Sequence, residues 1–305
     1  MGTIRKSPDK SKKLISITHT EKGTLYIIAT PIGNLGDISA RALDLLNSVD
    51  YIFAEDTRHS SKLLQHYGIN THCSSFHQFN EATKTSYIVQ LLQQNSTVAI
   101  IADAGTPLIS DPGYKLIRTI HQINQQNYIA GQKPINLCPI PGACALITAL
   151  SCSGLATDNF LFAGFLPAKT IARQTKIKTL ADQTATLVFY EAPHRLMHTL
   201  KDIYTVLGDR ETCVAKELTK IHQTITTQPL SLQIKHLSQN PKQIKGEYVI
   251  LVAGLPEKHQ QTQSLSSEEH KMLKILQKHC GTAKAAEIAS EITGISKKQC
   301  YKTLI

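Results

Sequence analysis

The sequence predicts an α/β protein in which two α/β domains meet at a cleft and a small helical module follows them. Short apolar runs alternate with amphipathic helical stretches up to residue 139, whereas the apolar runs after residue 140 include a pair at hairpin spacing. After Gly254 the composition shifts to Gln, Lys and Ser, which is typical of a linker. We therefore expect a disordered basic arm at 1–22 and two α/β domains at 23–139 and 140–255. A linker at 256–267 and a helical module at 268–305 are expected to follow.

The first domain is predicted to form a buried, mostly parallel sheet, because its strands are nearly continuous apolar runs with helices between them. These runs predict strands at Thr24–Thr30, Tyr51–Ala54, Thr97–Ala102 and Ile135–Cys138. Apolar residues at helical spacing predict helices at 42–49, Arg58–Tyr67 and Pro112–Ile123.

The second domain is predicted to contain a mixed sheet. It begins with a helix at Ala143–Ser151. Apolar runs then predict strands at Phe160–Phe165, Leu187–Glu191, Thr212–Lys216 and Glu247–Val252. The short separation of Cys213–Glu217 from Gln223–Thr227 indicates a hairpin, so part of this sheet is expected to be antiparallel.

The C-terminal module is predicted to contain three short helices. Apolar residues at helical spacing mark the first two, which Gly281 and Gly294 end. A capping box at Ser296 opens a third helix that carries Lys297 and Lys298. The arrangement is typical of a helix-turn-helix, so we expect either RNA binding through these lysines or a packing or dimerisation role.

The composition argues against several classes of protein. No stretch approaches the roughly 18 apolar residues needed to span a bilayer, and no apolar secretion signal is present, so we expect a cytoplasmic protein without a membrane partner. The 7 cysteines form no C-x-x-C pair, and the 13 histidines show no metal-binding spacing. We therefore expect neither a disulfide framework nor a metal.

The net charge of +10 is unevenly distributed, with more than half of it in residues 1–22 and 256–305. Such basic ends are common in nucleic-acid-binding proteins, although they also serve as solubilising tails. A second basic group is formed by Lys169, Arg173 and Lys176, which are spaced to share one helical face. This face is predicted to bind RNA phosphates, with a solvated helix surface as the alternative.

Two glycine-containing loops follow predicted strands of the first domain. No Walker A sequence and no G-x-G-x-x-G occurs, which disfavours P-loop hydrolysis and ordinary dinucleotide binding. The loops Ala29–Asp37 and Asp103–Gly113 instead lie where the carboxyl ends of parallel strands meet. We expect them to outline one small-molecule site.

Eight motifs carry a resemblance to a known family. In chain order they are TPIGNLGDIS, AEDTRHS, DAGTPLISDPG, PIPGACALITAL, GFLPAK, FYEAPHRL, AKELTK and KGEYVILVAG. Their order and spacing are similar to those of the bacterial 16S ribosomal RNA 2'-O-ribose methyltransferase I family, within the tetrapyrrole methylase superfamily. The resemblance covers about residues 23–254, and the C-terminal module is similar to one that many members append.

The resemblance implies two domains of tetrapyrrole-methylase type, with S-adenosylmethionine bound in the cleft between them. It further implies a homodimer and methylation of a cytidine ribose in the decoding region of 16S rRNA, in the 30S subunit or as free RNA. The cofactor loop has the form Thr-Pro-Ile-Gly-Asn at 30–34 where corrin and porphyrin methylases have Gly-Pro-Gly-Asp-Pro, which argues against a tetrapyrrole substrate. By motif, the implied cofactor residues are Pro31, Gly33, Asp103, Gly105, Leu108, Ile109, Ala143 and Tyr190.

Methyl transfer to a ribose requires an in-line hydroxyl and removal of its proton, because the hydroxyl is a weak nucleophile. Charged residues at the ends of predicted strands are the candidates for catalysis: Asp56, Arg58, Glu191, Lys216 and Glu217. Asp56 and Glu217 are the predicted bases, and Lys216 is predicted to stabilise developing negative charge. Alternatively, Asp56 and Arg58 form only a local ion pair at a helix N-terminus.

Two other functions remain open from the sequence. A methylase of the same fold could act on a small molecule or a protein, although the basic segments argue against that. A non-catalytic ribosome assembly factor could also have kept the fold. Binding of S-adenosylmethionine would distinguish the assembly factor from an enzyme.

Overall fold

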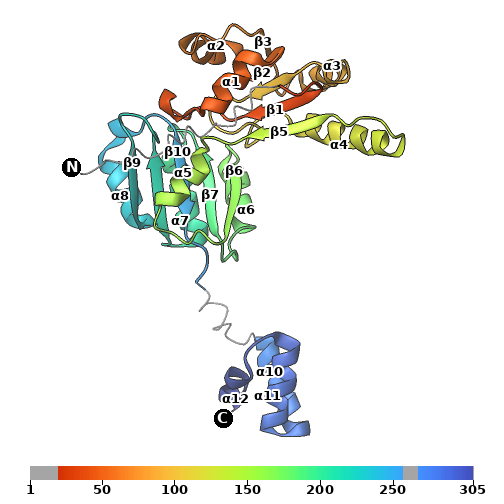
Figure 1. Ribbon diagram of the computed structural model, residues 1–305. Coiled ribbons are helices and arrows are strands. Elements are labelled where there is room, and N and C mark those ends of the chain that lie inside the picture. Colours follow the sequence, from red (N-terminus) through yellow and green to blue (C-terminus); the bar gives the residue numbers. More distant parts are fainter. Residues whose placement is uncertain (1–19, 257–266, 305) are drawn as a thin grey trace, which may run out of the picture.

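The computed structural model describes residues 20–256 and 267–304 (Figure 1). Residues 1–19 of the predicted basic arm and residues 257–266 of the predicted linker lie outside the described residues. Two separate five-stranded sheets are present, one in each half of residues 20–256. The predicted α/β class with two sheet-containing units is confirmed.

The first sheet is entirely parallel and has the strand order β3-β2-β4-β1-β5. Its strands are β1 (Thr24–Ile28), β2 (Tyr51–Ala54), β3 (Cys73–Ser75), β4 (Val98–Ile101) and β5 (Asn136–Ile140). The central strand β4 is buried along its whole length, as the continuous apolar run predicts. All five carboxyl ends meet at one edge of the sheet, where the two glycine-containing loops begin.

Helices cover both faces of the first sheet, because successive residues of each buried strand point to opposite sides. They are α1 (Ala40–Ser48), α2 (Thr57–His66), α3 (Glu81–Gln93) and α4 (Tyr114–Ile129), with a 3-10 turn at Leu35–Asp37. On one face Ile28 and Ile52 pack with Leu46 of α1. On the other face Leu25 packs with Ile88 of α3 in the same apolar cluster.

The second sheet is mixed, as predicted, with the order β6-β7-β10-β8-β9. Its strands are β6 (Phe160–Phe165), β7 (Thr186–Glu191), β8 (Glu211–Lys216), β9 (Thr224–Pro229) and β10 (Tyr248–Val252). Only β6 and β7 are parallel, while β10 runs antiparallel to both β7 and β8. The predicted hairpin is β8–β9.

Three helices cover one face of the second sheet, and a single helix lies on the other. The first group is α6 (Thr170–Lys178), α7 (Leu196–Leu207) and α8 (Leu230–Gln239), which a 3-10 turn at Pro241–Gln243 follows. The opposite face packs on α5 (Ala145–Cys152) and on Ile32 from the loop after β1. This second face is therefore the one through which the two domains meet.

The C-terminal residues form α10 (Ser267–Cys280), α11 (Thr282–Thr293) and α12 (Lys297–Leu304), as predicted. Their small core is Leu273, Ala286, Ala289, Ile295 and Cys300. The sequence patterns do not predict β3, α3, α7 or α8. In the part of the chain that the structure describes, no helix combines the length and apolar character needed to cross a bilayer.

Candidate active site

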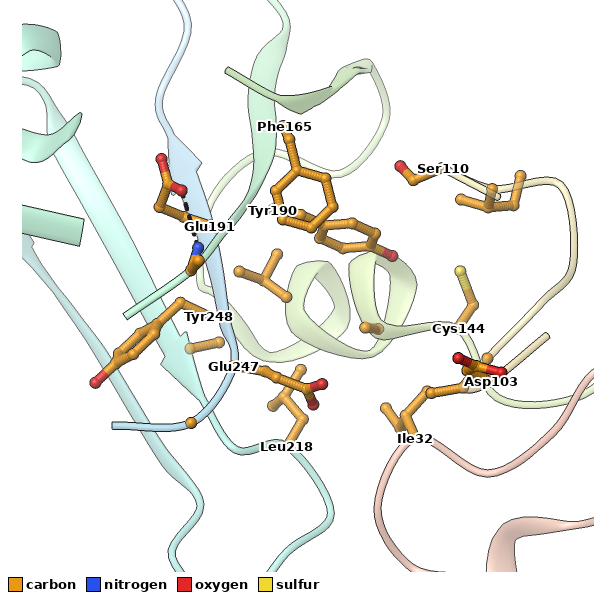
Figure 2. Close-up of a pocket in the computed structure, with 18 of the residues that line it drawn as sticks. Ile32, Asp103, Ser110, Cys144, Phe165, Tyr190, Glu191, Leu218, Glu247 and Tyr248 are labelled. Atoms are coloured by element: carbon orange, nitrogen blue, oxygen red, sulfur yellow. Dashed lines mark hydrogen bonds between the residues drawn. The ribbon is translucent and has the colours of Figure 1, made fainter. Parts of the chain in front are cut away.

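A cavity of about 410 Å³ lies between the two domains. Its walls come from the loops after β1 and β4, the start of α5, and the strands β6, β7, β8 and β10. Figure 2 shows Asp103 and Ile32 on the side of the first domain, with Leu218 and Glu247 on the side of the second. The volume is in the range that small-molecule sites of proteins occupy.

The loop after β4 forms the wall of the first domain. Thr106 Oγ1 donates to the Ala143 carbonyl oxygen at 3.0 Å, which ties this loop to the start of the second domain. Leu108 and Ser110 both adopt left-handed backbone conformations, with φ of 72° and 73°. Non-glycine residues in this region cost energy and concentrate at functional sites.

Three carboxyl groups, those of Glu55, Asp103 and Asp111, lie close together on the first domain's side of the cavity. Asp103 follows β4 and accepts a hydrogen bond from the Asp56 N–H at 2.9 Å, while Asp103 and Asp111 both line the cavity. Burial, together with the charges of Glu55 and Asp103, raises the pKa of Asp111 to about 7. Burial and Asp103 also raise the pKa of Glu55, although His77 acts in the opposite direction. Asp111 is therefore partly protonated near neutral pH.

Replacing Asp111 by asparagine is expected to stabilise the cofactor-free protein more at pH 8 than at pH 5. The folded-state pKa is raised from 3.8 to about 7, so the folded protein binds the Asp111 proton more tightly than the unfolded chain does. The free energy of unfolding of the wild type therefore falls as the pH rises from 3.8 to about 7, and Asp111 causes no further loss above that pH. Asparagine carries no such charge. Calorimetric melting at both pH values tests this, and a pH-independent difference in melting temperature would contradict it.

Tyr190 of β7 forms the wall on the side of the second domain. Its hydroxyl oxygen accepts a hydrogen bond from the Leu146 N–H at 3.2 Å, and burial raises its pKa. Phe162 and Phe165 both contact its ring in edge-to-face geometry. Figure 2 places Tyr190 between Phe165 and Cys144, facing the loop that carries Ser110.

The loop after β1 reaches across to the second domain and closes one end of the cavity. The Asn34 N–H donates to Thr219 Oγ1 at 3.0 Å. A Cβ on Gly33 would lie 2.5 Å from Lys220 Cγ and 3.0 Å from the Leu218 carbonyl oxygen. This position needs glycine because the two domains approach here backbone to backbone.

The eight residues predicted to bind the cofactor divide into two groups. Those that line the cavity are Asp103, Gly105, Ile109 and Tyr190. The other four lie in the same loops without forming the wall itself, namely Pro31, Gly33, Leu108 and Ala143. The Leu108 side chain packs against Gly113, and Ala143 contributes the carbonyl oxygen that accepts from Thr106.

Asp56 and Arg58 form the local pair that was the alternative to a catalytic role. Asp56 caps α2 by accepting from the Arg58 N–H, and the two side chains form a salt bridge of 2.8 Å. The hydrogen bonds from Arg58 lower the Asp56 pKa to about 2, which makes this carboxylate a weak base. Neither side chain belongs to the cavity wall formed by the described residues.

Lys216 and Glu217 also lie beside the cavity rather than in its wall. Lys216 Nζ donates to the Gln243 carbonyl oxygen at 2.6 Å. Glu217 has a φ of 48° and accepts from Lys220 Nζ at 2.8 Å and from the Glu247 N–H at 2.9 Å. Burial opposes its charge, but these hydrogen bonds prevail and lower the Glu217 pKa. Glu217 therefore organises the loop next to Gly246.

Glu191 is buried, and its oxygens are already used within the second domain. It accepts from the Ala192 N–H at 2.8 Å and from Thr199 Oγ1 at 2.5 Å, and Arg195 approaches it at 3.2 Å. In Figure 2 its carboxylate points away from Asp103 and Ser110. Although residue 191 borders the cavity, this geometry suits a supporting role better than proton transfer.

The predicted basic face on α6 is wrong for Arg173. Its side chain is only 3% exposed and forms a salt bridge of 2.6 Å with Asp202 of α7. Arg173 and Ile177 are four residues apart and both face the domain interior. Lys169 and Lys176 are exposed, so the predicted face is reduced to these two lysines.

Lys297 and Lys298 are both exposed on α12. Lys297 forms a salt bridge of 2.8 Å with Glu287 of α11, which partly neutralises it. The Glu287 pKa is lowered by the hydrogen bond from Lys297.

The residues of the cavity wall that the sequence patterns did not single out include Asp111 and Phe165. Asp111 lies within the DAGTPLISDPG motif but was not singled out, and its proximity to other carboxyl groups depends on the fold. Phe165 lies in GFLPAK, where it reads as an ordinary strand residue. The glycine before it is the only signal in the sequence that could have indicated an irregular strand.

Comparisons with known proteins agree with this architecture. Residues 24–233 match the family Tetrapyrrole (Corrin/Porphyrin) Methylases. The chain is 45% identical over 92% of its length to the Ribosomal RNA small subunit methyltransferase I of Haemophilus influenzae, covering 95% of that protein. The identity to the protein of the same name from Vibrio cholerae is 46%, over 91% of this chain and 93% of that one.

A solved structure shares the fold. The uroporphyrin-III-C-methyltransferase of Thermus thermophilus superposes with a TM-score of 0.51 at 16% identity, over 76% of this chain and 94% of that one. At this identity the likeness concerns the fold alone. With the family match and the close relatives, it leads to one assignment: the chain belongs to the tetrapyrrole methylase family and, within it, to the ribosomal RNA small subunit methyltransferase I family.

Proposed function

We propose that this protein uses S-adenosylmethionine to methylate the ribose 2'-hydroxyl of a cytidine in the decoding region of 16S rRNA. The observation that carries the proposal is the interdomain cavity with Asp103 and Asp111 in its wall, in a chain 45% identical to a ribosomal RNA small subunit methyltransferase I. The motif resemblance supports the ribose position and the cytidine. It also supports a cytoplasmic homodimer that acts on the 30S subunit or its RNA.

The residues of the cavity fit S-adenosylmethionine. The cofactor carries positive charge on its sulfonium and ammonium groups, and partly buried carboxyl groups such as Asp103 and Asp111 complement such charges. Ile32, Leu218 and Val249 offer apolar surface for an adenosine. When bound, the cofactor supplies a methyl group that is already activated for transfer. The protein then has to bind and orient the ribose and to accept its proton.

Asp111 is the proton acceptor that we propose. It lines the cavity, and its pKa of about 7 is close to the working pH, where a general base is most effective. Its carboxylate would receive the proton of the 2'-hydroxyl as the oxygen forms its bond to the methyl group. This assignment replaces Asp56 and Glu217, whose hydrogen bonds to Arg58 and Lys220 lower their pKa values.

Charge reversal at Lys169 and Lys176 is expected to weaken rRNA binding. Both side chains are exposed, and each phosphate contact that is lost lowers the salt dependence of log K by about one. Filter binding of Lys169→Glu/Lys176→Glu at several KCl concentrations measures this slope. Lys133→Glu is the matched control, because Lys133 is exposed but follows α4 in the other domain. Equal slopes for all three proteins would contradict a role for this face.

The proposed activity is tested with methyl-labelled S-adenosylmethionine and 30S subunits that lack the modification. Nuclease digestion and mass spectrometry then locate the label. Label on the ribose of a decoding-region cytidine is the expected result. Cofactor binding without label on 30S subunits or free 16S rRNA would contradict the RNA substrate and point to a small-molecule or protein acceptor. Absence of cofactor binding by calorimetry would instead indicate a non-catalytic assembly factor.

A further inference from the structure

A register break in β6 determines where Phe165 points. Phe162 pairs with Val188 and Phe165 with Tyr190, so three steps along β6 match two steps along β7. The extra residue forms a bulge at Ala163–Gly164, and Gly164 has a φ of 64°, a conformation that glycine adopts without strain. Bulges of this kind re-aim side chains next to functional sites.

The bulge brings Phe165 to the cavity. In an unbroken strand, residues 162 and 165 would face opposite sides of the sheet. Here the rings of Phe162 and Phe165 lie on the same face of the sheet as Tyr190. Their centroids are 4.8 Å and 5.7 Å from the Tyr190 ring centroid. Figure 2 shows Phe165 above Tyr190, with Ser110 across the cavity.

Phe165 differs from the other aromatic residues of the cavity wall in its exposure. Phe165 is 56% exposed, whereas Tyr248 is 3% exposed and Tyr190 is half-buried. A small cofactor enclosed between the domains would leave so open a ring largely in water. The exposed ring is better suited to a group that enters from solvent.

Two arginines, the buried Arg173 and the partly buried Arg195, fix the backbone that follows Phe165. Arg195 Nη2 donates to the Leu166 carbonyl oxygen, and Arg173 Nη1 donates to the Ala168 carbonyl oxygen at 3.0 Å. Each arginine is paired with an acid of its own, Glu191 and Asp202 respectively. The segment from Phe165 to the exposed Lys169 is therefore held rigid by two charge-assisted networks.

We propose that Phe165 is the stacking platform for the base of the nucleotide whose ribose is methylated. This inference rests on the proposed function. A ribose can enter a cavity only if its nucleotide is splayed out of the RNA stack, and an aromatic side chain offsets part of the lost stacking. Lys169, four residues further on, is exposed and would contact an adjoining phosphate. Phe165 acts as a positioning residue and takes no part in proton transfer.

The first test compares Phe165→Ala, Phe165→Leu and Phe165→Tyr with wild type in methylation of 30S subunits. Stacking on an aromatic ring is worth about 1–3 kcal/mol per base, so Ala and Leu should lower kcat/KM by about 10- to 100-fold while Tyr retains most of it. Tyr128→Ala, at an 87% exposed ring near the end of α4, is the control expected to match wild type. Values for Phe165→Ala and Phe165→Leu within twofold of wild type would overturn the proposal.

Two parallel measurements test whether the Phe165 ring instead contacts the cofactor or a second copy of this chain. Calorimetry should show a cofactor Kd changed less than twofold in Phe165→Ala, and a matching loss of cofactor affinity would assign the ring to the cofactor. Sedimentation should show the same oligomeric mass as wild type. A shift to smaller mass would assign Phe165 to an interface between copies of this chain. Either of these outcomes overturns the proposal.

A second test reads out stacking without catalysis. The chain contains 0 tryptophans, so Phe165→Trp and Tyr128→Trp each create a single fluorescent reporter. Protein-free 16S rRNA should quench Phe165→Trp strongly in the presence of S-adenosylhomocysteine and leave Tyr128→Trp nearly unchanged. Equal responses would overturn the proposal. If the wild-type protein labels no RNA while Phe165→Trp is quenched, the proposed reaction is contradicted but the stacking contact is supported.

Discussion

Asp202→Ala is expected to lower the free energy of unfolding of the second domain by about 3–5 kcal/mol, because it leaves the Arg173 guanidinium buried without a counter-charge. Asp202 Oδ2 accepts from Arg173 Nε at 2.6 Å, and Asp202 Oδ1 accepts from Gln174 Nε2 at 2.7 Å. The two charged side chains are only 3% and 10% exposed. Chemical denaturation followed by circular dichroism measures the loss.

Two variants show whether this cost comes from the uncompensated charge. The double variant Arg173→Met/Asp202→Leu should recover most of the stability, since apolar side chains of similar volume can replace a buried ion pair. Arg58→Ala removes a partner from an exposed pair and should leave the unfolding midpoint nearly unchanged, because solvent screens such pairs. A double variant no more stable than Asp202→Ala would contradict this account.

Asp111→Asn is expected to lower kcat by about 100-fold or more, the contribution of a positioned general base. The base works when deprotonated, so wild-type kcat/KM should rise with pH through about 7, the raised pKa of Asp111. This limb of the pH profile should disappear in the asparagine variant. Steady-state methylation of 30S subunits across pH 5.5–8.5 measures both effects.

The matched control is Asp56→Asn. Asp56 follows β2 on the same sheet edge, but it caps α2 and lies outside the cavity wall of the described residues. We expect its kcat to stay within about threefold of wild type. If Asp111→Asn kept the wild-type pH profile, or if Asp56→Asn lost more activity, the assignment of the base would be wrong.

Most strands could be predicted because burial leaves a local signature. The strands β4 and β10 are buried throughout and read as continuous apolar runs. By contrast, β3 consists of Cys-Ser-Ser at the sheet edge, where half-buried polar residues give no such pattern. The helix α7 begins at Leu196, the last residue of the FYEAPHRL motif, and its buried Thr199 and Asp202 interrupt the apolar stripe.

The sequence predicted the loops that border the candidate site but only some of the residues that line it. The glycine-containing loops do border the cavity, because parallel strands deliver their carboxyl ends to one edge. Asp56 and Glu217 are as close to strand ends as Asp103, yet a helix cap and a left-handed turn direct them to other partners. Such directions depend on one or two dihedral angles, which sequence spacing does not encode.

The family assignment came from motif order, which is independent of those dihedral angles. The close relatives confirm this assignment, whereas the base candidates Asp56 and Glu217 are directed to other partners and remain predictions. Phe165 shows the same limit, since one extra residue in β6 reverses the side of the sheet that its ring faces.

The two strand orders have different consequences for folding during translation. Every strand of the first sheet has been made once residue 140 is synthesised, so that domain can fold while the rest of the chain is still being added. In the second sheet the central strand β10 is the last to be made, and it separates β6–β7 from β8–β9. Until Val252 leaves the ribosome, both pairs expose an unpaired strand edge, which makes this interval the one most open to aggregation and to chaperone binding.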